Sequence, residues 1–205
     1  MTLFSSPYLL GRTLANHEDC TYPHPRTCHF HRDGHTELCT GAQEEKRSRY
    51  LSADEIKRLL DVLDYYPHKN ISHALKIILF TGSRRGEVLG ATWNQFNFEK
   101  KTWTKPMQKT KQRRTEYIPN NDETLSVLIE MKKTINSIFL FPSDSKEGHM
   151  LDFKNSWKNV CKLAKLEDVR VHDLRHTYAS LLINNGISLS VIGRLLGHKD
   201  VSTTA

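Results

Sequence analysis

The chain has 205 residues and carries 30 Lys and Arg against 23 Asp and Glu, a formal net charge of +7. This length suffices for one sizeable domain with a proper hydrophobic core plus an appendage. No apolar run is long enough to span a membrane and no secretory signal is recognisable, so we expect no membrane partner. The four cysteines show no Cys-x-x-Cys spacing, which favours a reduced, cytoplasmic setting.

The basic charge is unevenly distributed along the chain. Residues 1–46 hold four Lys/Arg and six Asp/Glu, which leaves 26 basic and 17 acidic residues in the remainder. This excess of positive charge suggests a polyanionic partner. Taken alone, the charge is equally compatible with a soluble basic surface that has no specific partner.

Residues 1–47 are the part of the chain least like a folded domain. They show no sustained helical or strand periodicity, and they are rich in potential metal ligands: His17, Cys20, His24, Cys28, His29, His31, His35 and Cys39. Structural zinc sites usually show closely spaced ligand pairs, whereas the gaps between these cysteines are wide and irregular. We therefore predict no metal site and interpret residues 1–47 as an irregular or disordered leader.

The next segment has the periodicity of helices. Ser52 and Glu55 form the pattern of a capping box, followed by the spacing of a buried helix face at Ile56, Leu59, Leu60 and Leu63. Asn70 or Ser72 can cap a second helix, which is apolar nearly all round and is therefore predicted to be central. Helical periodicity returns after residue 121, where Cys161 falls on a buried stripe and is interpreted as a core residue.

Between these helices, residues 81–87 read Thr-Gly-Ser-Arg-Arg-Gly-Glu. Gly82 permits a sharp turn, and Arg84 then starts the next helix with Glu87 one helical turn later. An arginine near a helix N-terminus adds a fork of donors to a place that already favours anions. The alternative is a surface Arg–Glu pair between two core helices.

Residues 93–121 are predicted to form a small sheet. Trp93, Phe96 and Phe98 alternate with polar residues, and further β-like runs follow at 102–104 and 116–119. A basic connection lies between the last two runs, with the residues Lys105, Lys109, Lys111, Arg113 and Arg114. Such a hairpin suits a DNA groove or backbone, although a merely solvated hairpin has the same pattern.

The C-terminal part places His172 and Arg175 one helical turn apart, and a second amphipathic run ends at His198. That run has the spacing of a helix face packed on a core, at Leu189, Ile192, Leu195 and Leu196. A cation and two imidazoles held on packed helices can bind and protonate a phosphodiester. A surface or capping pair is the alternative for His172 and Arg175.

Taken together, four motifs resemble one family. The segment at 81–87, the Lys-rich hairpin that ends in Tyr-Ile-Pro, His-Asp-Leu-Arg-His-Thr and Leu-Leu-Gly-His-Lys-Asp occur in the order seen in tyrosine recombinases of the phage integrase type. Each motif is weak alone, but four in this order are specific. The resemblance covers residues 48–205, the catalytic domain, and implies a mainly α-helical fold with a small antiparallel β-sheet.

The resemblance also implies roles for individual residues. Arg84 would be the first catalytic arginine and Glu87 the acidic residue that supports the site. His172 and Arg175 would form the central His-x-x-Arg pair, and His198 would be the last histidine of the site.

The catalytic lysine of the hairpin is less sharply assigned. Counting back from Pro119 favours Lys111, whereas the Lys-Thr pairing leaves Lys109 open.

The family chemistry is attack by a tyrosine oxygen on a DNA phosphodiester, with a 3′-phosphotyrosyl bond formed and a 5′-hydroxyl expelled. It requires no metal or other cofactor and no small-molecule substrate, and it implies double-stranded DNA as the partner, with a tetramer assembled on the DNA.

Two departures from the family pattern set expectations for activity. The nucleophilic tyrosine of the family follows the last histidine closely, yet residues 199–205 contain no tyrosine, and neither Tyr117 nor Tyr178 has the right place in the pattern. Residues 1–47 also do not resemble the N-terminal DNA-clamping domain of integrases. We therefore expect this 205-residue chain to lack its nucleophile, and the alternative function is a catalytically inactive DNA-binding remnant of an integrase.

Overall fold

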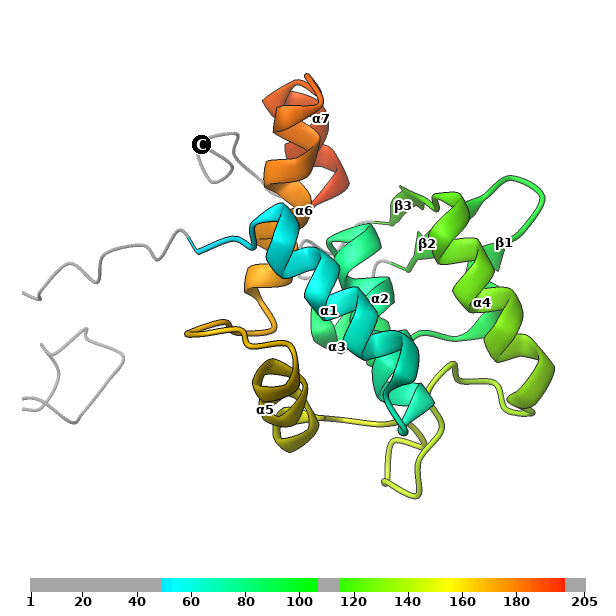
Figure 1. The fold of residues 1–205 in the computed structure, drawn as a ribbon. Coiled ribbons are helices and arrows are strands. Elements are labelled where there is room, and N and C mark those ends of the chain that lie inside the picture. The colour runs from blue at the N-terminus through cyan, green and yellow to red at the C-terminus, as the bar shows by residue number, and fades with distance from the viewer. Residues whose placement is uncertain (1–48, 107–114, 198–205) are drawn as a thin grey trace, which may run out of the picture. The chain divides into compact units, whose positions relative to one another are not determined.

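Within residues 49–106 and 115–197, which the computed structural model describes, seven α-helices accompany a three-stranded antiparallel sheet (Figure 1). The helices are α1 (Ala53–Tyr65), α2 (Lys69–Thr81), α3 (Arg85–Leu89), α4 (Asp122–Thr134), α5 (Lys154–Leu163), α6 (Asp173–Asn184) and α7 (Leu189–Leu195). The strands are β1 (Phe96–Asn97), β2 (Thr102–Lys105) and β3 (Glu116–Pro119). The predicted fold class, mainly α with a small antiparallel sheet, is confirmed.

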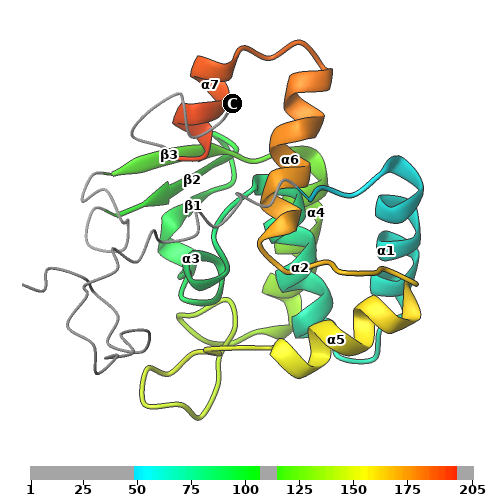
Figure 2. The ribbon, with the colours of Figure 1, turned by 90° about the vertical axis from the view of Figure 1, so that its left-hand side faces the viewer.

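Helix α2 is the centre of the helical layer, and it contacts α1, α3, α4 and α6 (Figure 2). Its central position follows from its sequence, because the helix is apolar on nearly all sides and Leu75, Ile77 and Ile78 are fully buried. Its predicted start was wrong, since His68 rather than Asn70 or Ser72 occupies the N-cap. Ser72 is buried, and its hydroxyl donates instead to the Leu63 carbonyl, which joins α2 to α1.

The predicted capping box at the start of α1 is confirmed. The Ser52 hydroxyl accepts from the backbone N–H of Glu55, and the Glu55 carboxylate accepts from the backbone N–H of Ser52 at 2.9 Å. The segment before the helix is tied to α6, because the Leu51 N–H donates to the Thr177 hydroxyl at 2.9 Å. These bonds anchor the start of the described chain against the helix that carries Arg175.

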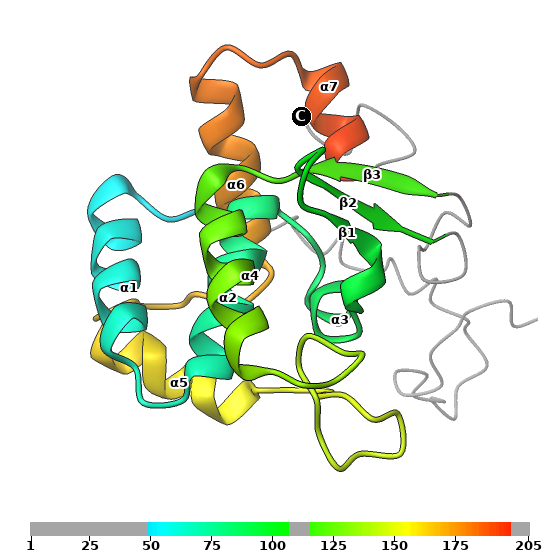
Figure 3. The same cartoon turned by 90° about the vertical axis from the view of Figure 1, so that its right-hand side faces the viewer.

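The sheet has the order β1-β2-β3 and lies at one side of the helical layer, next to α3 (Figure 3). In the pairing of β2 with β3, Trp103 is opposite Ile118 and Lys105 is opposite Glu116. Residues two apart in a strand share a face, so Lys105 and Glu116 point inward together with the fully buried Trp103 and Ile118. The sheet thus carries two charged side chains into the protein.

No helix among the described residues is long and apolar enough to cross a membrane. The predicted leader at 1–47 and its His and Cys residues lie outside the described residues.

Candidate active site

The turn after α2 places Arg84. Helix α2 ends at Gly82, whose backbone is left-handed with φ of 62°, and Arg84 is the N-cap of α3. A Cβ atom on Gly82 would overlap the Tyr178 ring and approach a Leu196 methyl group to 2.8 Å. The predicted sharp turn therefore needs glycine at position 82 for two reasons. The backbone is left-handed there, and the close approach of α6 and α7 leaves no room for a side chain.

Arg84 is held by Glu87. The Arg84 guanidinium donates to Glu87 Oε1 at 2.8 Å, and the Arg84 backbone N–H donates to Oε2 at 3.1 Å. The Glu87 side chain is only 8% exposed, so the alternative of a surface Arg–Glu pair does not hold. Burial raises the pKa of Glu87, but the contacts with Lys105 and Arg84 outweigh it and keep the pKa below its ordinary value. Glu87 is thus a buried carboxylate at neutral pH.

Arg175 joins the turn at Gly82 to the end of α7. Its buried guanidinium donates to the Gly82 carbonyl at 2.7 Å and to the Leu196 carbonyl. Burial and the nearby charge of Arg84 lower the pKa of Arg175 to about 10, so it stays protonated at neutral pH. Two arginines from different helices therefore stand close enough to feel each other's charge, an arrangement suited to one shared anion.

His172 stands at the N-cap of α6, one turn before Arg175. Partial desolvation lowers the pKa of His172, and the neighbouring His176 and Arg175 lower it further. A lowered pKa leaves the imidazole neutral near pH 7, when it can accept a proton.

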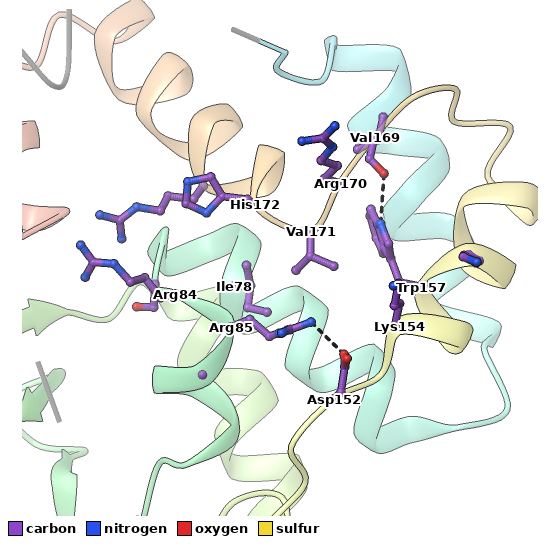
Figure 4. A pocket seen from close by; sticks show the side chains of 14 residues that line it. Ile78, Arg84, Arg85, Asp152, Lys154, Trp157, Val169, Arg170, Val171 and His172 are labelled. Atoms are coloured by element: carbon purple, nitrogen blue, oxygen red, sulfur yellow. Dashed lines mark hydrogen bonds and ion pairs between the residues drawn. The ribbon is translucent and has the colours of Figure 1, made fainter. Parts of the chain in front are cut away.

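Arg84, His172 and Arg175 line a basic pocket of about 680 Å³ (Figure 4). Arg84 comes from the turn before α3 and His172 from the start of α6, while further cations follow along the pocket: Arg85, Lys154, Lys158 and Arg170. Asp152 is the one acidic side chain among the lining residues, and it is bound by Arg85 at 2.8 Å. The pocket therefore offers an excess of positive charge on both sides of His172.

The structure brings four of the predicted site residues together, namely Arg84, Glu87, His172 and Arg175. Lys105 does not fit the predicted exposed basic connection, because it is 4% exposed and its ammonium is bonded to Glu87 Oε2 at 2.6 Å. The other predicted residues lie outside the described residues: Lys109, Lys111, Arg113, Arg114 and His198.

The sequence reasoning missed two polar residues next to these four. Ser83 is buried, and its hydroxyl accepts from the Lys105 ammonium at 2.9 Å. Glu116 is buried beside Gly197, and its Oε1 has no hydrogen-bond partner among the described residues. The alternation of β3, with Ile118 inward, was the signal that would have placed Glu116 inside.

Tyr178 and Cys161 have the properties of packed side chains. Burial raises the pKa of Tyr178, whose ring lies against Gly82, and burial raises the pKa of the half-buried Cys161 thiol to about 11. Raised pKa values disfavour the ionised, nucleophilic forms of both groups.

The sequence profile of the phage integrase family matches residues 49–205. The chain belongs to this family. Among curated relatives, the integrase of Salmonella phage P22 is 30% identical over 173 residues, which cover 77% of this chain and 43% of that protein. The tyrosine recombinase XerA of Pyrococcus furiosus is 31% identical over 159 residues, which cover 75% of this chain and 54% of that protein.

The fold agrees with this membership. The catalytic domain of bacteriophage HP1 integrase matches with a TM-score of 0.57 and 26% identity, over 76% of this chain and 83% of that one. The Tn1549 transposon integrase, solved in complex with a circular intermediate DNA, matches with a TM-score of 0.68 and 18% identity, over 78% of this chain and 61% of that one. The chain spans about half the length of the curated relatives that it matches.

Proposed function

We propose that residues 48–205 form the catalytic domain of a site-specific tyrosine recombinase that cuts and rejoins double-stranded DNA. The observation that carries the proposal is the convergence of Arg84, Arg175 and His172 in one basic pocket, with Arg84 fixed by the buried Glu87. The related proteins named above are integrases and recombinases, and one of them was solved with DNA.

The proposed reaction moves a phosphodiester without a metal or other cofactor. A tyrosine oxygen attacks the phosphorus and forms a phosphotyrosyl bond, while the bond to the 5′-oxygen breaks. Arg84 and Arg175 neutralise the charge that develops on the non-bridging oxygens. His172, whose pKa is lowered, accepts the tyrosine proton, and the hairpin lysine gives a proton to the leaving 5′-oxygen.

The roles outside the described residues belong to the same proposal. Lys111, or alternatively Lys109, acts as the hairpin lysine, and His198 positions the phosphate. Lys109, Lys111, Arg113 and Arg114 bind the DNA backbone, and the complete protein works as a tetramer. The proposed reaction requires an attacking tyrosine, which in the family pattern closely follows the last histidine.

The decisive experiment is covalent capture. The gene is sequenced beyond codon 205, and the protein translated from the complete frame is incubated with DNA from the region that flanks the gene. We expect a denaturation-resistant adduct in which a tyrosine is joined to a 3′-phosphate, and its loss in the Arg84→Ala variant. Salt-sensitive DNA binding without any adduct would instead support an inactive DNA-binding remnant.

A further inference from the structure

Lys105 is the last residue of β2, and its side chain lies inside the protein at 5% exposure. Its ammonium donates to Glu87 Oε2 at 2.6 Å and to the Ser83 hydroxyl at 2.9 Å. It also stands 4.5 Å from the centre of the Trp103 ring. A lysine held by these partners is not available to a DNA groove, so its charge serves another purpose.

The partners of Lys105 connect the sheet to the turn that carries Arg84. Glu87 Oε2 accepts from both the Lys105 ammonium and the Arg84 backbone N–H, and Oε1 accepts from the Arg84 guanidinium. Lys105 and Arg84 therefore share one buried carboxylate. Among the described residues, the other titratable groups that face this cluster are Glu116 from β3, and Arg175 and His172 from α6 and its N-cap.

We propose that Lys105 is a positioning residue, which holds the Glu87 carboxylate so that Glu87 in turn fixes Arg84 against the DNA phosphate. The proposal rests on the recombinase function proposed above. It gives the cation a role without contact to DNA, because a buried carboxylate that loses one of its two cations is protonated more readily and then holds the arginine less firmly.

The charges around Glu87 predict the direction in which its pKa changes when Lys105 is removed. Burial raises the pKa of Glu87. Lys105 has the largest effect among the groups that lower this pKa below its ordinary value of 4.5. Without Lys105 the effect of burial is opposed by Arg84 and by the nearby charge of Arg175, so the pKa of Glu87 in the folded protein rises. The stability that the ionised carboxylate contributes above its unfolded pKa would then become smaller at neutral pH, and this loss would fade on acidification.

The first test measures unfolding by urea in the 205-residue chain for Lys105→Met, Glu87→Gln and the double variant. We expect Lys105→Met to lower the urea midpoint clearly at about pH 7 and less at about pH 4. In the Glu87→Gln variant, Lys105→Met should lower the urea midpoint only slightly, because the carboxylate that Lys105 holds is already absent. Lys101→Met is the matched control, since Lys101 binds Asp122 at the exposed end of the same sheet.

The second test measures DNA cleavage in the complete protein at saturating DNA. We expect Lys105→Met to slow cleavage about ten- to a hundredfold, with DNA affinity nearly unchanged, because Arg84 is misplaced rather than removed. The acid limb of the pH–rate profile should move to higher pH, and raising the pH should restore part of the rate. A mere loss of folded protein would lower the rate most at neutral pH, where the variant is least stable, and raising the pH would not restore it.

Three results would overturn the proposal. Additive effects of Lys105→Met and Glu87→Gln on stability would show that the pair is not coupled. A smaller salt dependence of DNA binding in Lys105→Met would show a direct phosphate contact. An unshifted acid limb would show that Lys105 does not act through the ionisation of Glu87. If the unsubstituted protein cleaves no DNA, the recombinase proposal fails, and the stability cycle alone decides whether Lys105 holds Glu87.

Discussion

At the scale of single residues, Arg175 combines a structural and a proposed chemical task. Its guanidinium satisfies the buried carbonyls of Gly82 and Leu196, which belong to two segments far apart in the sequence. Burial fixes the side chain in one place, and the planar fork leaves further N–H groups for an anion. A residue placed in this way contributes to stability even before any DNA is bound.

We therefore expect Arg175→Met to lower the free energy of unfolding by about 2–3 kcal/mol, because two buried carbonyls lose their donors. Arg85→Met is the control, since the Arg85–Asp152 pair is exposed and should contribute less than about 1 kcal/mol. Both variants are compared by urea unfolding at neutral pH. Equal destabilisation by the two substitutions would contradict the stabilising role that we assign to the buried hydrogen bonds of Arg175.

At the scale of elements, the end of α2 controls where Arg84 stands. Gly82 closes the helix in a left-handed conformation, and α6 and α7 press on it through Tyr178 and Leu196. The start of α3 then follows at once, with Arg84 as its N-cap. The site thus depends on a helix junction at which four helices meet, namely α2, α3, α6 and α7.

This junction predicts opposite outcomes for two nearby glycines. Gly82→Ala should destabilise the protein by at least about 1–2 kcal/mol from the backbone conformation alone, and the overlap with Tyr178 adds to this loss. Gly86→Ala should be neutral or stabilising by up to about 1 kcal/mol, because Gly86 lies in α3 with open space around its Cα. Thermal unfolding of both variants measures the contrast, and a loss of stability in Gly86→Ala as large as in Gly82→Ala would refute it.

At the scale of the whole molecule, the excess of basic residues after residue 46 agrees with the cations that line the pocket. Lys158 and Arg170 are exposed there, on α5 and in the segment before α6. If DNA passes over this pocket, its phosphates release counterions as these side chains approach.

We expect the 205-residue chain to bind duplex DNA with an affinity that falls steeply as salt rises. Lys158→Gln and Arg170→Gln should each reduce the slope of log affinity against log salt by about one, as for one lost phosphate contact. Lys76→Gln is the control, because Lys76 of α2 is bound by Asp64 of α1 and does not line the pocket. Fluorescence anisotropy over a salt series gives the slopes, and unchanged slopes for both pocket variants would place the DNA elsewhere.

The sequence by itself determined the fold class and four residues of the candidate site. Helical and strand periodicity follow from which faces must be buried, so the helices and the small sheet could be predicted locally. Arg84, Glu87, His172 and Arg175 could be predicted because four motifs, each weak alone, occur in the order of the family that they resemble.

Only the tertiary structure decided which residues Lys105 and Glu116 lie against. In the sequence, Lys105 opens a run of basic residues and resembles a solvent-exposed cation. It points inward with Trp103 on the buried face of β2, where its partner Glu87 comes from another element. A charged side chain is buried only where the fold supplies an opposite charge, and such pairings between distant segments cannot be predicted from local spacing.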